Sequence, residues 1–386
     1  MLCLDDVGWH DGRDLRYIGQ ASRSGLPRDH APDDYIILGA LGKAIDMKIL
    51  CPLCLGDWDK DNFLRGALGV THDPHNWDRA AEIDLEYSKR CFDALESAHI
   101  EYAVHGLMHG RYDENGGLIW EREYFVPKKD KESGKMLSVL DLDNFKRRLD
   151  LFFKIYDSWG FSQKIRTFVC PCGLHGVSEE DVTKMTAELY SRGIRYAANG
   201  TKVFDEPMKV YSGIGYVKKC GNAKGGHSVP WEAYDVDPNY LCDFNSESEN
   251  NMPKSNVIGM HLTNFIRYNP ENNMQRLDDW IAYFKRQSEV FGIMIAKDIA
   301  FSVNQQFYHM YAKLNETENG CEIDLGEVAR RRIEPHENVF YVSLKKGVCP
   351  TECDGGKIEK YDEHAEFVTY RVCYDKEKIT LTFSHN

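Results

Sequence analysis

Two histidines, His105 and His109, stand four residues apart in the stretch EYAVHGLMHGRYDENG, and each is followed by glycine. Neutral imidazole is the most common protein ligand for zinc, and this spacing can direct two rings toward one ion. In a chain with 14 histidines the spacing alone does not distinguish a metal site from chance. A metal site therefore requires a third, acidic ligand elsewhere in the sequence.

Three other polar residues follow apolar runs. Asp5 and Asp6 end the run MLCLDD, and His261 lies at the end of the run in NVIGMHLTNF. One carboxylate and two imidazoles leave coordination positions open on zinc, which is typical of a catalytic site. A divalent metal lowers the pKa of bound water to about 7, a carboxylate can remove the water proton, and an imidazole can protonate a leaving group. Taken singly, the two aspartates also fit a turn, and the lone histidine also fits a hydrogen-bonded core position.

Strands and helices must position these residues. Over the first 265 or so residues, short apolar runs alternate with amphipathic stretches, which predicts strands separated by helices. Repeated helix-then-strand order predicts a parallel sheet with helices outside it and an active site at the C-terminal strand ends. The expected strands are MLCLDD, residues 47–53, the run before His105, IRTFVCP, IRYAANG and the run before His261; the expected helices lie in residues 34–46, 78–100, 141–160, 178–193, 273–292 and 296–314.

The chain changes character toward its C-terminus. From about Gly320 the apolar period falls to two, as in NVFYVSL and KITLTF, which predicts antiparallel strands. We therefore expect a (β/α) domain over residues 1–318 and a small all-β accessory domain over residues 319–386. Two stretches rich in glycine and charge, Asp11 to Asp33 and Arg111 to Lys135, are expected to form loops or lids at the site.

The bulk composition narrows the possible partners. A net charge of −13 argues against a surface that neutralises phosphates, so nucleic acid is not expected as a partner. No segment approaches the roughly 20 apolar residues needed to span a bilayer, so no membrane association is expected. The N-terminus has no signal-peptide pattern, which predicts a cytoplasmic protein unless a leader was removed. Twelve cysteines scattered over 386 residues indicate reduced thiols.

The ordered set of Asp-Asp, His-Gly-x-x-His and a late lone histidine resembles the polysaccharide deacetylases of the NodB homology type, carbohydrate esterase family four. The resemblance covers roughly residues 1–313. It implies an irregular seven- or eight-stranded (β/α) barrel, a carbohydrate substrate, and a divalent metal, zinc first, with cobalt, nickel, manganese or iron as alternatives. The implied reaction is hydrolytic removal of an acyl group, N-acetyl before others.

The resemblance also implies a role for each residue. Asp5 corresponds to the general base and His261 to the general acid. Cys172, in FVCPCG, corresponds to the oxyanion position. The implied metal ligands are Asp6, His105 and His109. In WEAYDVDPNY, Trp231 and Tyr234 are candidates for stacking on a sugar, and Asp235 and Asp237 are candidates for pairing with the last histidine.

One position departs from the family pattern. Where the family has an arginine that orients the base, this chain has Val169, followed by Cys170 in place of a proline, and Arg166 is the nearest arginine on that strand. Three functions remain open: carbohydrate deacylation, hydrolysis of another amide or a glycosidic bond by the same fold, and a catalytically silent metal-containing protein that binds carbohydrate.

Overall fold

The structure is a computed structural model that describes residues 1–8, 20–21, 28–199, 208–221, 257–292 and 294–385. The chain divides into two compact units, Met1–Ile299 and Ala300–Asn386. The sequence pattern predicts a division at 318/319, whereas the units divide at 299/300. The helix α9 (Ile299–Tyr311), expected to finish the first domain, therefore lies almost entirely in the second unit.

Contacts inside the second unit explain this difference. The Gln305 side chain on α9 donates to the Val339 carbonyl at 3.0 Å, and the hydroxyls of Tyr308 and Tyr374 lie 2.9 Å apart. Strand periodicity identifies strands but carries no information about which helix packs on them. The helix therefore belongs with the strands that follow it.

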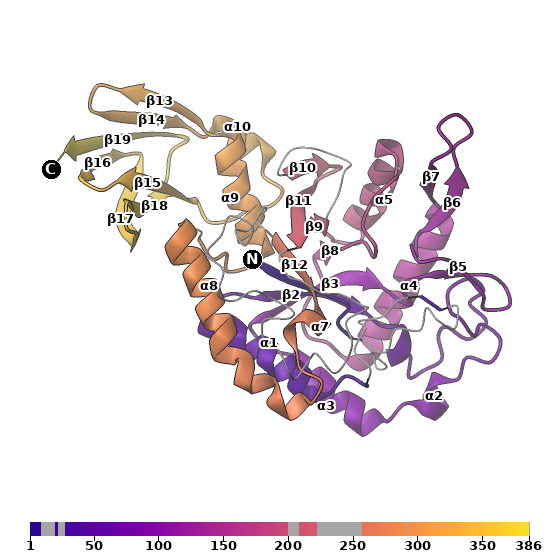
Figure 1. The fold of residues 1–386 in the computed structure, drawn as a ribbon. Helices are drawn as coiled ribbons and strands as arrows, with labels where there is room; N and C mark the ends of the chain where they lie inside the picture. Colours follow the sequence, from indigo (N-terminus) through magenta and orange to yellow (C-terminus); the bar gives the residue numbers. More distant parts are fainter. Residues whose placement is uncertain (9–19, 22–27, 200–207, 222–256, 293, 386) are drawn as a thin grey trace. The chain divides into compact units, whose positions relative to one another are not determined.

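Within the described residues of the first unit, seven parallel strands close a barrel (Figure 1). Going around it, the order is β1, β2, β3, β8, β9, β11, β12 and back to β1, so the expected (β/α) barrel is confirmed. A further strand, β10 (Met208–Tyr211), pairs antiparallel with β11. The barrel strands are β1 (Leu2–Asp5), β2 (Ile49–Cys54), β3 (Ile100–Gly106), β8 (Thr167–Phe168), β9 (Tyr196–Asn199), β11 (Ile214–Gly221) and β12 (Val257–His261).

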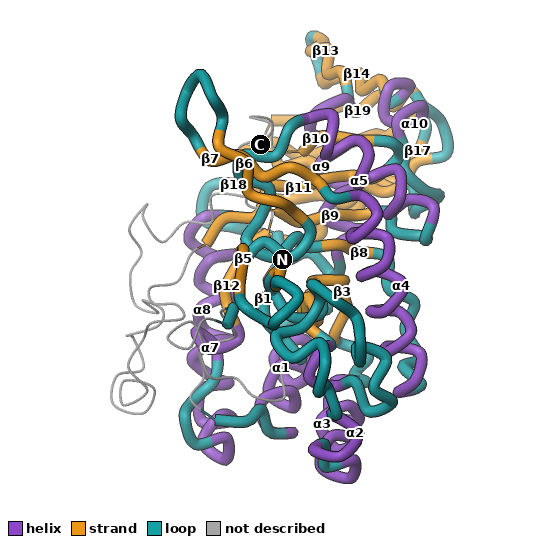
Figure 2. Tube along the Cα trace, turned by 90° about the vertical axis from the view of Figure 1, so that its right-hand side faces the viewer, coloured by secondary structure: helices purple, strands orange, loops and turns teal. Residues whose placement is uncertain are grey.

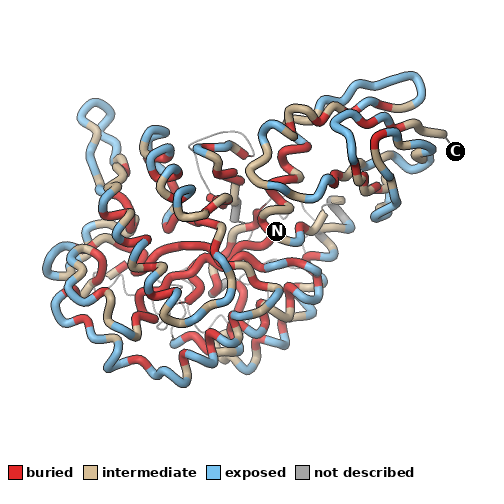
Figure 3. Tube along the Cα trace, turned by 180° about the vertical axis from the view of Figure 1, so that it is seen from behind, coloured by how far each residue is buried: buried red, intermediate tan, exposed pale blue. Residues whose placement is uncertain are grey.

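The composition of the strands explains why they occupy the centre of this unit. All six residues of β2, Ile-Leu-Cys-Pro-Leu-Cys, are buried, as are all four residues of β9. Parallel strands covered on both faces read as continuous apolar runs. Figure 3 shows the buried positions concentrated on these central strands.

Helices surround the strands (Figure 2). In α4 (Leu142–Trp159) the apolar spacing buries one face, Asp141 caps the N-terminus by accepting from the Asn144 N–H at 3.1 Å, and Gly160 ends the helix in the left-handed conformation. This is the boundary that Gly160 predicts, since glycine adopts positive φ without a steric cost. The other helices of this unit are α1 (Pro32–Ala44), α2 (Arg79–Glu82), α3 (Leu85–Leu95), α5 (Glu179–Ser191), α7 (Leu262–Phe265) and α8 (Leu277–Phe291), with 3₁₀ turns η2 (Gly56–Trp58) and η4 (Pro270–Arg276).

Two expectations about local structure are corrected. The single helix expected over residues 78–100 is two helices, α2 and α3, because the Asp84 carboxylate caps a new N-terminus by accepting from the Tyr87 N–H. The loop expected from Arg111 to Lys135 contains strands: β4 (Arg111–Tyr112) pairs with β5 (Leu118–Trp120), and β6 (Phe125–Lys129) pairs with β7 (Met136–Leu140). Most of the other expected loop, Asp11 to Asp33, lies outside the described residues.

The second unit contains two antiparallel sheets, in the orders β13-β14-β19-β16 and β15-β18-β17. The expected antiparallel tail is therefore present, although the short helix α10 (Gly326–Arg331) and α9 mean that this unit is not purely β. Its strands are β13 (Lys313–Thr317), β14 (Gly320–Asp324), β15 (Val339–Lys345), β16 (Val348–Asp354), β17 (Gly356–Glu363), β18 (Phe367–Tyr374) and β19 (Lys378–His385).

Glu101 lies near the start of β3, at the opposite end of that strand from His105. Its carboxylate accepts from the Ile299 N–H at 3.2 Å. Burial, and then the nearby charge of Asp298, raise the pKa of Glu101 to about 7, against the opposing charges of Lys48 and Arg166. The barrel therefore holds a carboxyl group that titrates near neutral pH at the end remote from the histidines.

Two further findings bear on the sequence expectations. The ten cysteines whose side chains the structure describes are free thiols. Among the described residues, no helix combines the length and the apolar character that crossing a membrane requires.

Candidate metal centre

The barrel topology brings three predicted polar groups to one rim. Asp5 is the last residue of β1 and pairs in register with His261, the last residue of the neighbouring strand β12. Asp6 follows directly, and His105 lies near the end of β3, two strands away on the other side. Because all these strands are parallel, their C-terminal ends meet at the same edge of the barrel, as the sequence pattern predicts.

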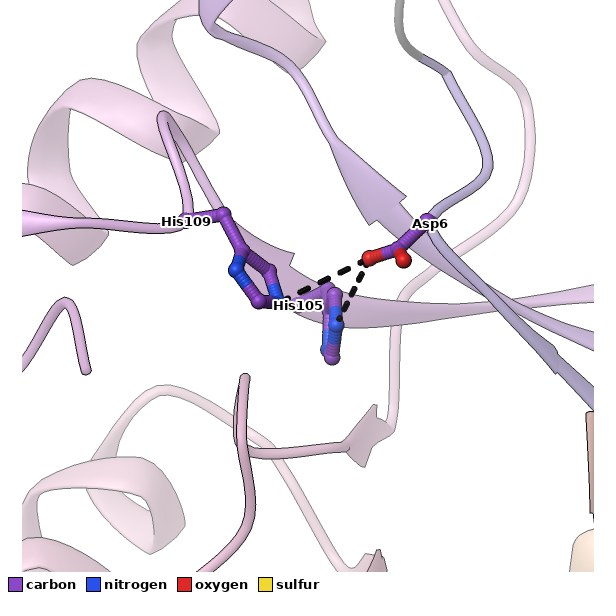
Figure 4. A group of neighbouring side chains, drawn as sticks. All are labelled: Asp6, His105 and His109. Atoms are coloured by element: carbon purple, nitrogen blue, oxygen red, sulfur yellow. Dashed lines mark ion pairs between the residues drawn. The ribbon is translucent and has the colours of Figure 1, made fainter. Parts of the chain in front are cut away.

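Asp6, His105 and His109 form a buried cluster (Figure 4). Asp6 Oδ1 lies 3.4 Å from His105 Nε2 and 3.6 Å from His109 Nε2, and all candidate ligand atoms lie within 4.8 Å of one another. Two ligands at about 2.1 Å from a tetrahedral zinc ion lie about 3.4 Å apart. The three side chains, none more than 5% exposed, are thus spaced as a zinc-like ion requires.

Groups around the histidines fix their orientation. His105 Nδ1 lies 2.7 Å from the Val169 carbonyl oxygen. Because a carbonyl only accepts, Nδ1 carries a proton and Nε2 is the ring nitrogen that faces Asp6, which is the usual orientation of a metal-binding histidine. His109 Nδ1 lies 3.9 Å from Cys172 Sγ on its far side. Val169, at the position expected to hold an arginine, thus contributes its backbone to the site.

The electrostatics of the cluster favour positive charge. Burial lowers the pKa of His105, but the hydrogen bond with Asp6 and the charges of Asp5 and Asp6 outweigh burial, so the pKa lies above its ordinary value. A cation at this point is therefore stabilised by the surrounding carboxylates. The donor set and its charge both fit a divalent metal ion.

The backbone is unusual at this site. Six described residues other than glycine have positive φ, and three of them are Asp6 (φ 63°), His109 (φ 53°) and Cys172 (φ 54°). Such conformations are uncommon outside glycine and cluster at functional sites. The turns after β1, β3 and β8 are therefore specialised to aim these side chains.

A partly buried cation accompanies the predicted base, although it is not an arginine. Lys219 Nζ on β11 forms an ion pair and hydrogen bond with Asp5 Oδ2, and the two side chains are 12% and 16% exposed. Burial raises the pKa of Asp5, but Lys219, followed by His105 and His261, lowers it more, so the pKa lies below its usual range. Asp5 is therefore ionised at neutral pH, as a general base must be.

Arg166 does not take this position. It precedes β8, its guanidinium lies 5.6 Å from the centre of the Tyr196 ring, and it is not among the residues that line the cavity beside Asp5. Sequence reasoning missed Lys219 because β11 was not recognised as a strand. The available signal was a pair of lysines inside the otherwise apolar run IGYVKKCG.

His261 lies beside the cluster without belonging to it. Its Nε2 is 3.9 Å from Asp6 Oδ2, and its side chain is 36% exposed, far more than those of the three candidate ligands. The histidine therefore has access both to the cluster and to solvent, which suits a group that exchanges protons.

A cavity of about 210 Å³ connects these groups. Its walls include Asp5, His261, Lys219, Cys172 and Asn199. Cys172, the predicted oxyanion residue, is thus located on the cavity wall.

Asn199, at the end of β9, is a further polar residue of the cavity that the sequence did not indicate. It is 1% exposed, and its Oδ1 accepts from the Cys170 N–H at 2.9 Å. Its Nδ2 has no hydrogen-bond partner among the described residues. A buried N–H donor without a partner is costly, so it fits a ligand acceptor group.

Four predicted residues cannot be located. Trp231, Tyr234, Asp235 and Asp237, proposed from the sequence to contact the sugar or the last histidine, lie outside the described residues.

The chain matches no protein-family model and no curated protein sequence. The likeness to the deacetylases is therefore one of motifs and their order.

Proposed function

We propose that the protein is a metal-dependent hydrolase that removes an acyl group, N-acetyl before others, from a carbohydrate. The observation that carries the proposal is one cavity lined by the two histidines of the buried Asp6–His105–His109 cluster, by a second carboxylate, Asp5, and by a more exposed histidine, His261. A three-ligand set of this kind leaves positions open for water and substrate. A positioned base and acid are what hydrolysis of an amide adds to such a site.

Asp6, His105 and His109 would hold the metal. When bound, a divalent metal supplies Lewis acidity that polarises an acyl carbonyl and makes water more acidic. Asp5 accepts the proton of the attacking water, while Lys219 holds Oδ2 of the carboxylate in place. The Cys3 thiol, 3.4 Å from Oδ1, restrains the other oxygen more weakly.

Two further groups complete the reaction. His261 donates a proton from its ring to the departing amine, and its exposure allows it to regain a proton from solvent. On the opposite part of the substrate, the Asn199 Nδ2 can donate to an acyl or sugar oxygen, because its own Oδ1 is already fixed by the Cys170 N–H. The volume of about 210 Å³ suits a small acyl group and part of one sugar ring, since it is below the roughly 300–1,000 Å³ of sites for drug-sized ligands.

The Asp5–Lys219 pair bears on the alternative that the protein binds carbohydrate but has no catalytic activity. That alternative was motivated by Val169 in place of the arginine that orients the base. Lys219 supplies a cation to the same carboxylate from another strand, so the valine alone gives no reason to expect a loss of chemistry. Hydrolysis of a non-sugar amide would use the same reacting atoms as deacylation of a sugar. The two reactions differ only in the part of the substrate that surrounds the acyl group.

The experiment is an acyl-release screen on protein whose metal content has been measured. We expect metal-loaded protein to release acetate from N-acetylated chitooligosaccharides, chelation to abolish release, and added zinc to restore it. O-acetylated xylooligosaccharides and an N-acetyl amino acid test the ester and the non-sugar amide. Metal-loaded protein that releases acetate from none of these substrates would contradict the proposal, and release from the amino acid alone would assign the non-sugar amide.

A further inference from the structure

The turn that carries both histidines wraps around a buried carboxylate. Glu123, which is 0% exposed, accepts three consecutive backbone N–H groups: Leu107 at 2.8 Å, Met108 at 3.1 Å and His109 at 2.8 Å. Successive N–H groups that converge in this way form an anion-binding concavity. Here the anion is a side chain of the same protein, and the last of the three N–H groups belongs to a candidate metal ligand.

Arg148 holds that carboxylate in place. Its guanidinium lies 3.1 Å from Glu123 Oε1, and both side chains are 0% exposed. The same guanidinium donates to the Gly69 carbonyl and to Asn144 Oδ1, so its own position is fixed from other sides. Replacing a buried ion pair with apolar groups is often neutral or stabilising, which makes such a pair weak evidence for a role in stability alone.

The other end of the turn is fixed as well. The Tyr124 hydroxyl donates to the His105 carbonyl at 2.9 Å. Between the two histidines, a Cβ at Gly106 would approach Glu123 Oε2 to 2.4 Å, so glycine is what lets the carboxylate reach the turn. Neighbouring residues, Glu123 and Tyr124, thus restrain the backbone at both candidate ligands.

We propose that Glu123, oriented by Arg148, is a positioning residue that places the two histidine ligands before any metal binds. This inference rests on the metal-binding part of the proposed function and not on the reaction. Glu123, Arg148 and Tyr124 form a clamp around the turn. The clamp is made entirely of protein groups, so the turn does not depend on the ion for its conformation. Groups that orient metal ligands typically change metal affinity by about 10–100-fold when they are removed.

The first test needs no metal. In chelator-treated full-length protein, hydrogen exchange of the Leu107, Met108 and His109 amides should be slow. In Glu123→Gln, at least one of the three donors faces an amide N–H₂ instead of an oxygen, and their exchange should be at least tenfold faster. Amides of β2 and β9 should keep their protection in both proteins, which shows that the barrel is intact. Equal exchange at the turn in both proteins would overturn the proposal.

The second test measures zinc affinity by competition with a chelator. We expect Glu123→Gln to weaken zinc binding at least tenfold. Asp59→Asn is the matched control, because Asp59 is also buried and its carboxylate also accepts backbone N–H groups, from Phe63 and Leu64, but in another loop. It should leave zinc affinity within about twofold. A folded Glu123→Gln protein with wild-type affinity, or an equal loss in the control, would show that Glu123 is structural only.

A milder variant keeps the proposal testable if Glu123→Gln does not fold. Arg148→Lys retains the buried charge but loses the planar fork that orients the carboxylate. It should weaken zinc binding severalfold and speed exchange at the turn, and wild-type values for both would overturn the proposal. If the wild-type turn is protected but the protein binds no zinc or other divalent metal, the proposed function fails while the clamp itself stands.

Discussion

Replacing Lys219 with methionine removes the charge that faces Asp5 and keeps most of the side-chain volume. Exposed ion pairs contribute about 0.2–1 kcal/mol, and breaking a fully buried pair costs about 3–5 kcal/mol. With side chains 12% and 16% exposed, the Lys219–Asp5 pair lies between these limits. We therefore expect Lys219→Met to lower the free energy of unfolding by about 2 kcal/mol at pH 7.

The assay is denaturant unfolding of the metal-free full chain, followed by tryptophan fluorescence. All seven tryptophans of the sequence precede residue 300, so the signal reports the barrel unit alone. Asp5→Asn should cost a similar amount, and the double variant should be more stable than the sum of the single losses predicts by at least about 1 kcal/mol. Lys219→Arg, which keeps the charge, should recover most of the stability. Additive losses, or a Lys219→Met loss below about 0.5 kcal/mol, would refute the inference that these groups form a coupled partly buried pair.

Three further outcomes follow from the site and the barrel. His105→Ala should lose most of its bound metal in elemental analysis, because three ligands leave no redundancy, and full stoichiometry in that variant would remove the metal assignment. Asp5→Asn and His261→Ala should each keep their metal but lower the turnover number for acyl release by about a hundredfold or more, and wild-type turnover in both would show that the acid and base are assigned wrongly. Because the folded pKa of Glu101, about 7, lies above its ordinary value, the native state loses stability as pH rises from about 4.5 to 7. Glu101→Gln should therefore be more stable than wild type at pH 8 by about 2 kcal/mol, with little difference near pH 4.5, and a difference independent of pH would contradict the raised pKa.

The sequence predicted the barrel where strands are apolar and helices amphipathic. The runs before Asp5, His105 and His261 are strands that end where expected, because burial on both faces leaves a continuous apolar signal. The division between the units was placed too late, because the helix α9 shows only its own amphipathic pattern and not the strands it packs against. Strand β11 was missed because Lys219 interrupts its apolar run.

At the site, residue types and order indicated the candidate ligands but not the groups that support them. Asp6, His105 and His109 do gather, since parallel strands end at one rim. Lys219 is 214 positions from Asp5, and spacing cannot reveal a pairing made by barrel closure. Arg148 did leave a signal, because it lies on the buried face of α4 among phenylalanines, where a charged residue needs a buried partner.

The left-handed backbone at Asp6 and His109 restricts how this centre can be re-engineered or can evolve. For most residues that conformation costs about 1–2 kcal/mol, and asparagine, aspartate and histidine tolerate it best after glycine. A library that exchanges ligand types to change metal preference should therefore retain those short polar residues at positions 6 and 109 and reject glutamate or β-branched residues there, whatever metal they would favour. His105 lies at an irregularity in the pairing of β3 with β2, but it does not have a positive φ and carries no such restriction. Of the three ligand positions, it is the one at which side-chain chemistry can be varied without also changing the conformational preference of the backbone.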